Sequence, residues 1–222
     1  MKRKAVVLLS GGLDSAVTLY SAKAEGYVCH CLTFDYGQRH KKEIEQARRL
    51  AEKAGASFKL VKLKLPWGGS SLLDKYADLP RDRSIAEINS GIPDTYVPGR
   101  NTIFLSIAAS YAESIGARAV FIGAHSEDSS GYPDCRIEYL KLFDRIVKCG
   151  TKAGLEGKLE LKFPLIDKDK ARIIKLGQSL GVPFEFAWSC YEGGPKICMR
   201  CDSCVLRAKG FREAGLKDPV AC

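Results

Sequence analysis

The chain has 222 residues, of which 45% are hydrophobic and 27% are charged, a balance typical of globular proteins that excludes a disordered or fibrous one. No apolar run approaches the length needed to cross a bilayer, so we expect no membrane association. The net charge of +9 is concentrated C-terminally, where residues 141–222 carry sixteen Lys and Arg against ten Asp and Glu. Charge alone does not distinguish nucleic acid, a nucleotide, an acidic small molecule or plain solvent as the partner of this surface.

Strand and helix patterns alternate along the chain, beginning with an apolar run that ends in glycines and is followed by apolar residues at helical spacing. The expected strands are residues 4–9, 27–34, 58–65, 119–122 and 159–163. The expected helices are residues 13–20, 41–54, 101–115, 137–149 and 170–180. Together they predict an α/β fold with a doubly wound, mainly parallel five-stranded sheet that is covered by helices on both faces.

Two stretches depart from this alternation. Residues 66–99, rich in Gly, Pro, Ser and Asp, are too long for a simple connection and predict a partly ordered lid or pocket wall. The second stretch begins at Trp188 and contains a cysteine cluster. We therefore predict a main domain, residues 1–187 with the insertion 66–99, and a small C-terminal segment, residues 188–222.

The first predicted strand ends in a glycine loop, Ser10-Gly11-Gly12-Leu13-Asp14-Ser15, that leads into a helix. Backbone N–H groups and the helix N-terminus converge in such a loop and suit a phosphate, and the Ser10 and Ser15 hydroxyls add donors. The loop lacks both the Gly-Lys-Ser/Thr ending of a Walker loop and the G-x-G-x-x-G of a dinucleotide fold. Asp14 is expected to hold Mg²⁺ against the phosphates, with a first-turn acid that complements the helix dipole as the alternative. An ordinary glycine-containing turn is the alternative for the whole loop.

Four of the nine cysteines, Cys190, Cys198, Cys201 and Cys204, form C-x7-C-x2-C-x2-C. Four thiolates at this spacing can surround one tetrahedral ion, which predicts a structural zinc site with no position left for water. An iron–sulfur cluster is the rival, but a ferredoxin-like run would add a cysteine where Ala208 stands. This clustering, together with an N-terminal apolar run too short for a signal peptide, favours an unexported, cytoplasmic protein.

SGGLDS at 10–15 resembles the signature of the pyrophosphate-loop ATP pyrophosphatases, and the chain resembles one family among them, the QueC family of the queuosine pathway. The further carriers of this resemblance are FDYGQRHKKE at 34–43, VPGRNTIFLS at 97–106, GYPDCR at 131–136, and WSCYEGG with CMRCDSC within 188–204. The resemblance implies an adenine nucleotide alpha hydrolase-like fold. It also implies a carbon–nitrogen ligase that uses ATP to convert 7-carboxy-7-deazaguanine and ammonia to 7-cyano-7-deazaguanine. That reaction passes through adenylated intermediates and an amide, and it releases AMP and pyrophosphate.

The resemblance also implies which residues bind the ligands. The expected ATP contacts are Leu8, Leu9, Ser10, Gly11, Gly12, Leu13, Asp14, Ser15, Ala16, Val17, Thr18, Arg100 and Asn101. The expected substrate contacts are Asp128, Tyr132, Asp134 and Arg136, around the end of the fourth strand, where open sheets bind ligands. A carboxylate can accept from the N–H groups of a guanine edge, and an arginine can pair with the substrate carboxylate.

Three residues are expected to be catalytic: Asp14, Lys170 and His40. A solvated first-turn lysine is the alternative for Lys170, a structural histidine is the alternative for His40, and a helix cap is the alternative for Asn101. The chain departs from the typical family pattern at His125 and Ser129, so the pocket wall there is expected to differ.

Two other functions stay open at this point. A tRNA-modifying, thiolating enzyme would share the loop, the basic C-terminal region and the thiols, but the chain has no recognisable RNA-binding appendage beyond the cysteine segment. A zinc-ribbon binding module without ATP chemistry would leave five βα units and a phosphate loop unexplained. The expected partners are therefore ATP with Mg²⁺, 7-carboxy-7-deazaguanine and ammonia, with no membrane and no stable nucleic-acid partner. A homodimer is left open.

Overall fold

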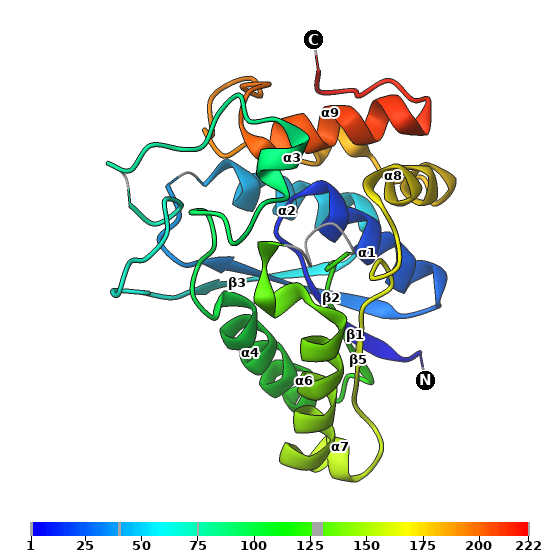
Figure 1. Ribbon diagram of the computed structural model, residues 1–222. Coiled ribbons are helices and arrows are strands. Elements are labelled where there is room, and N and C mark those ends of the chain that lie inside the picture. The colour runs from blue at the N-terminus through cyan, green and yellow to red at the C-terminus, as the bar shows by residue number, and fades with distance from the viewer. Residues whose placement is uncertain (1, 40, 75, 126–130, 222) are drawn as a thin grey trace.

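A five-stranded sheet forms the centre of the computed structural model, which describes residues 2–39, 41–74, 76–125 and 131–221 (Figure 1). The strands are β1 (Lys4–Leu8), β2 (Val28–Asp35), β3 (Ser57–Lys62), β4 (Ala119–Phe121) and β5 (Glu160–Lys162). Their order is β3-β2-β1-β4-β5, and every neighbouring pair is parallel. The predicted five-stranded α/β fold is therefore confirmed. Because the chain builds outward from β1 first to β3 and then to β5, the topological switch point lies between β1 and β4.

Helices cover both faces of the sheet, and each helix predicted from the sequence is present. They are α1 (Leu13–Ala24), α2 (Lys42–Ala54), α3 (Ile85–Ile88), α4 (Arg100–Ser114), α6 (Ile137–Gly150), α7 (Lys152–Leu155), α8 (Lys170–Ser179) and α9 (Asp202–Ala214), with 3-10 turns η1 (Pro133–Cys135) and η2 (Phe184–Phe186). The helices α3, α7 and α9 were not predicted. A capping box explains α3, since Ser84 accepts from the Glu87 N–H and the Glu87 carboxylate accepts from the Ser84 N–H.

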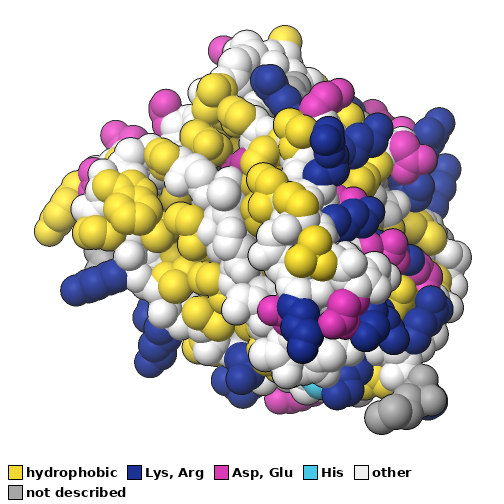
Figure 2. All heavy atoms as spheres, turned by 90° about the horizontal axis from the view of Figure 1, so that it is seen from below, with side chains coloured by type: hydrophobic (Ala, Val, Ile, Leu, Met, Phe, Trp, Pro, Cys, Tyr) yellow, Lys and Arg dark blue, Asp and Glu magenta, His cyan; other side chains and the backbone are white. Residues whose placement is uncertain are grey.

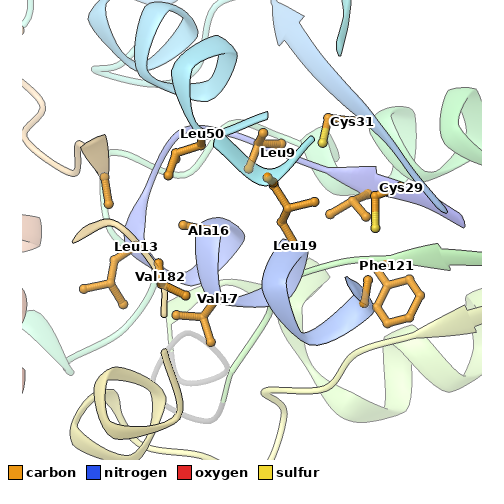
Figure 3. Packing of buried hydrophobic residues seen from close by; sticks show 14 of the residues in the cluster. Leu9, Leu13, Ala16, Val17, Leu19, Cys29, Cys31, Leu50, Phe121 and Val182 are labelled. Carbon is orange, nitrogen blue, oxygen red and sulfur yellow. The ribbon is translucent and has the colours of Figure 1, made fainter. Parts of the chain in front are cut away.

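Alternate residues of the strands point to opposite faces of the sheet. Val7 of β1 and Phe121 of β4 pack with α1, α2 and α8, whereas Val6 of β1 and Val120 of β4 pack with α4 and α6. Figure 3 shows part of the first cluster, in which the labelled residues are Leu9, Leu13, Ala16, Val17, Leu19, Cys29, Cys31, Leu50, Phe121 and Val182. The two clusters fix the sheet from both sides and hold the carboxyl ends of its strands in register.

Some apolar side chains remain on the surface. Leu142 and Ile146, four residues apart on α6, and Leu155 of α7 are each more than half exposed. Figure 2 views the molecule from below and shows hydrophobic side chains gathered among Lys and Arg side chains on that face. A homodimer, which the sequence leaves open, stays open. In the part of the chain that the structure describes, no helix combines the length and apolar character that a membrane span requires.

Candidate active site

A cavity of about 330 Å³ lies at the carboxyl ends of β1, β2 and β4. Its position matches the topological switch point, where open parallel sheets bind ligands, and its volume is in the range of small-molecule sites. Its wall includes residues of the glycine loop at 10–15, of the insertion 66–99, and of the segment 188–222, which we call the cysteine segment. Residues far apart in the sequence therefore meet around one cavity.

The glycine loop has the geometry of an anion site. Gly11 has a φ of +89°, and a Cβ atom there would lie 2.1 Å from the Glu43 carbonyl oxygen, so only glycine fits. The Ser10 hydroxyl donates to Ser15 Oγ at 3.1 Å and accepts from the Gly12 N–H at 3.3 Å. The N-cap of α1 is Gly12, and no side chain of the described residues caps this helix. The first-turn N–H groups are thus left for a ligand such as a phosphate.

Asp14 of this loop forms a largely buried polar cluster with Lys170 and His125. Lys170 Nζ donates to Asp14 Oδ1 at 2.8 Å and Oδ2 at 2.9 Å, and it lies 2.9 Å from His125 Nε2. Burial alone would raise the pKa of the Asp14 carboxyl, but the charges of Lys170 and His125 bring it below its ordinary value. The structure thus brings two of the predicted catalytic residues into contact. Lys170 is buried, so it is not a solvated first-turn lysine.

His125 had no predicted role and is fully buried in this cluster, three residues beyond the predicted end of the fourth strand. The helix α9 packs closely against Lys170, because a Cβ atom at Gly210 of α9 would lie 2.4 Å from Lys170 Cγ. Gly210 therefore gives the stem of Lys170 the space it needs to reach Asp14.

The third predicted catalytic residue, His40, lies outside the described residues, as does the predicted substrate contact Asp128.

Glu43 and Gln38 add a carboxylate and an amide to the cavity wall. Gln38 accepts from the Tyr36 N–H at 2.9 Å and donates to the Phe34 carbonyl at 3.2 Å and to Glu43 Oε1 at 3.0 Å. Burial raises the pKa of Glu43 to about 7, although Gln38 and Arg100 oppose the shift. Neither residue was assigned a role from the sequence. Their place within the FDYGQRHKKE motif was the signal that could have identified them.

The N-terminus of α4 provides Arg100 and Asn101, which both line the cavity. Arg100 Nη1 donates to the Tyr36 hydroxyl at 3.3 Å. Burial opposes the charge of Arg100, but Tyr36 and the neighbouring Cys135 and Asp134 groups raise its pKa, so the guanidinium stays charged. Asn101 is the second residue of α4 and not its cap, which is Gly99.

Asp134 is tied to the α4 terminus. Its Oδ2 accepts from the Asn101 N–H at 3.0 Å, and its carbonyl accepts from Asn101 Nδ2 at 3.2 Å. The buried carboxylate therefore caps α4, and Asp134 is absent from the described lining of the cavity. Arg136, another predicted substrate contact, is the exposed N-cap of α6. Tyr132 does line the cavity, and its hydroxyl lies 2.8 Å from Thr95 Oγ1.

The predicted ATP contacts are divided between the cavity and the core. Those that line the cavity are Leu8, Leu9, Ser10, Gly12, Leu13, Asp14, Ser15, Arg100 and Asn101. Ala16 and Val17 lie on the buried side of α1, and Thr18 Oγ1 donates to the Asp14 carbonyl at 2.8 Å. Further lining residues that were assigned no individual role from the sequence are Ile88, Asn89, Thr95, Trp188, Ser189, Tyr191, Ser203 and Leu206.

The cysteine segment brings its four thiols together as predicted. The sulfur atoms of Cys190, Cys198, Cys201 and Cys204 all lie within 4.8 Å of one another, and those of Cys198 and Cys204 are 3.9 Å apart. A tetrahedron with metal–sulfur bonds of about 2.3 Å has edges of about 3.8 Å, so the spacing fits a metal ion. The N–H groups of Cys198 and Glu192 point at Cys190 Sγ, at 3.3 and 3.5 Å, and would stabilise a thiolate there.

Comparison with known proteins agrees with these features. The family model described as queuosine biosynthesis protein QueC matches residues 4–215. The 7-cyano-7-deazaguanine synthase of Thermosynechococcus vestitus is 53% identical over 221 residues, which cover 98% of this chain and 95% of that protein. Its counterpart in Thermoplasma acidophilum is 51% identical, with 99% and 92% covered. Among solved structures, NMN synthetase from Francisella tularensis shares the fold, with a TM-score of 0.51, 16% identity, and coverage of 97% of this chain and 79% of that one.

Proposed function

Because the chain belongs to the QueC family of queuosine biosynthesis proteins, we propose that it is an ATP-dependent ligase that makes 7-cyano-7-deazaguanine from 7-carboxy-7-deazaguanine and ammonia. The observation that carries this proposal is the meeting of the glycine loop with Lys170 in a cavity of ligand size. An anion site beside a buried cation suits a triphosphate whose α-phosphorus is attacked.

The first chemical step joins the substrate carboxylate to the α-phosphorus and releases pyrophosphate. The N–H groups at the start of α1 hold the β- and γ-phosphates, and Lys170 offsets the negative charge that develops at the α-phosphate. Asp14 is the residue that we propose to hold Mg²⁺, since magnesium in nucleotide sites usually takes one or two carboxylates together with phosphate oxygens. The ion would supply further neutralisation of the phosphate charge.

Ammonia then attacks the acyl carbon, the bond to the AMP oxygen breaks, and one proton is lost, which leaves an amide and AMP. In a second activation the amide oxygen attacks the α-phosphorus of another ATP. Loss of AMP with that oxygen and of the remaining N–H protons gives the nitrile. One molecule of product therefore consumes two molecules of ATP. The substrate is a free base, so the reaction needs no tRNA.

We propose zinc as the ion of the four-cysteine site, because four thiolates suit its tetrahedral preference and leave no position for a substrate. The ion would be structural and would stabilise a segment too short for a large core of its own. No disulfide joins the cysteines of the described residues, which supports a reducing cytoplasmic location.

The test is incubation of the purified protein with ATP, Mg²⁺, ammonium and 7-carboxy-7-deazaguanine, followed by mass spectrometry of the base and the nucleotides. Formation of the nitrile with two AMP and two pyrophosphate would support the proposal. If ATP were cleaved to AMP while the base stayed unchanged, the substrate assignment would be wrong, and tRNA would be the next substrate to try. No cleavage of ATP under any of these conditions would refute the activity.

A further inference from the structure

The insertion 66–99 and the cysteine segment are joined by backbone contacts. Arg81 forms an antiparallel bridge with Cys201, and the Asp82 N–H donates to the Arg200 carbonyl at 2.8 Å. Asp82 and Met199 are the two non-glycine residues of the described chain with a positive φ, at +55° and +61°. Both strained positions lie at this junction, and strain of this kind persists only where the surrounding structure holds it in place.

Side chains reinforce the same junction, since three consecutive residues of the insertion pair with the cysteine segment. The ion pairs are Arg81 with Glu192, Asp82 with Arg200, and Arg83 with Asp202. The first two ion pairs are largely exposed and contribute little to the stability of the junction. The third is different, because Asp202 is buried and the Arg83 guanidinium meets it through two nitrogens, with Nε 3.1 Å from Oδ1. Removal of Arg83 would leave a buried carboxylate without its main counter-charge.

Both sides of this junction line the cavity. The insertion contributes Ile88, Asn89 and Thr95, and α3 lies against α9 (Figure 1). The cysteine segment contributes Asp202 and Ser203, which lie between Cys201 and Cys204 in the sequence. The positions of these lining residues therefore depend on how the four cysteines are held together. The same segment reaches the glycine loop, where the Trp188 N–H donates to the Gly11 carbonyl at 2.8 Å.

We infer that the four-cysteine site, when it holds its metal, fixes the insertion over the cavity through the Arg83–Asp202 pair and so forms the wall that binds the purine-like acceptor. Arg83 is a positioning residue, which acts on the ligand through Asp202 and α3. The identity of the acceptor rests on the proposed function, whereas the coupling between the metal site and the insertion does not.

The first test is hydrogen–deuterium exchange on the full-length, metal-loaded protein, before and after removal of the metal with a chelator. The inference expects amide exchange in residues 80–96 to rise roughly tenfold when the metal is removed, in parallel with residues 188–206, while α6 stays protected. Faster exchange confined to 188–206 would overturn the inference. If α6 lost its protection as well, the whole protein would have unfolded, and the metal-loaded variants described next would decide.

The second test compares Arg83→Ala, Arg83→Lys and the control Arg49→Ala, all with their metal content measured. Arg49 forms an exposed ion pair with Glu45 on α2, so the control removes one surface cation away from the junction. Arg83→Ala should keep its metal, exchange faster in 80–96, and raise the KM for the carboxylated base about tenfold with little change in the KM for ATP. Arg83→Lys should recover part of this loss, and Arg49→Ala should behave as wild type.

The inference fails if Arg83→Ala holds its metal and shows wild-type exchange in 80–96. It also fails if the KM values for ATP and for the base rise together, because that would indicate a general loss of structure. If wild type proved inactive toward the base, the proposed function would be lost, and the exchange data alone would still support or overturn the coupling.

Discussion

Glu43→Gln is expected to stabilise the protein at alkaline pH, although it alters a residue of the cavity wall. Burial raises the pKa of the Glu43 carboxyl from 4.5 to about 7, so the folded protein holds this proton more tightly than the unfolded chain does. The stability that comes from the protonated carboxyl is fully present below about pH 4.5, and it is lost as the pH rises through about 7. Glutamine cannot ionise, so the Glu43→Gln variant does not lose this stability as the pH rises.

The size of the effect follows from the shift. A change of about 2.5 pKa units corresponds to about 3 kcal/mol at about 1.4 kcal/mol per unit. This is an upper limit, because the side chain is only partly buried and borders the cavity. Glutamine also keeps an oxygen that can accept from Gln38 Nε2, now 3.0 Å from Glu43 Oε1. We therefore expect the free energy of unfolding to rise by roughly 1–3 kcal/mol at about pH 8.5, with the gain shrinking toward zero near pH 4.5.

Urea unfolding between about pH 5 and about pH 8.5 measures this difference. The matched control is Glu45→Gln on the same helix, whose carboxylate is exposed and pairs with Arg49, and it should change stability by less than about 0.5 kcal/mol. A Glu43→Gln variant that was less stable than wild type at the higher pH would refute the argument. A gain that was the same at both ends of the pH range would refute it as well, because the predicted effect comes from ionisation.

Three further outcomes are expected. Gly210→Ala should displace Lys170 and lower turnover at least tenfold with metal retained, as measured by AMP release, whereas Gly150→Ala, where a Cβ meets nothing within 4 Å, should be close to wild type. Cys201→Ser should lose most of its zinc, by metal analysis, and a full zinc content would refute the ligand assignment. Asp14→Ala should reduce pyrophosphate release by roughly 100-fold or more, with folded-state circular dichroism preserved, and retained activity would remove Asp14 from the mechanism.

The sheet was predictable from the sequence because apolar residues are continuous in residues 119–122 and alternate with charged ones in residues 58–65 and 159–163, as expected for strands. The helix α9 (Asp202–Ala214) was missed for a physical reason. Its buried residues are Asp202, Cys204, Arg207, Gly210 and Phe211, which include only one large apolar side chain. The spacing of hydrophobic residues along the sequence cannot reveal such a helix. Its packing depends instead on the four-cysteine cluster and on the buried ion pair of Arg207 with Asp218.

The candidate site was predictable as a set of residue types, but the roles of single residues were less so. The contact of Asp14 with Lys170 joins residues 156 apart in the sequence and requires the folded α1 and α8. Asp134 was expected to bind the substrate, yet its carboxylate accepts from the first turn of α4. A helix terminus and a guanine edge both present N–H donors to a carboxylate, so a sequence motif cannot distinguish the two uses.

Four features that weaken this fold lie at the cavity or at the junction of the insertion with the cysteine segment. Glu43 holds a carboxyl with a raised pKa, Gly11 needs a positive φ, and Asp82 and Met199 adopt a backbone conformation that is unfavourable for residues with a side chain. Two of these residues belong to the cavity wall or to the loop that forms it, and the other two lie where the insertion meets the cysteine segment. Selection for stability alone would remove such features, so their presence at the cavity wall and at the junction whose two sides line the cavity indicates a functional site independently of any motif.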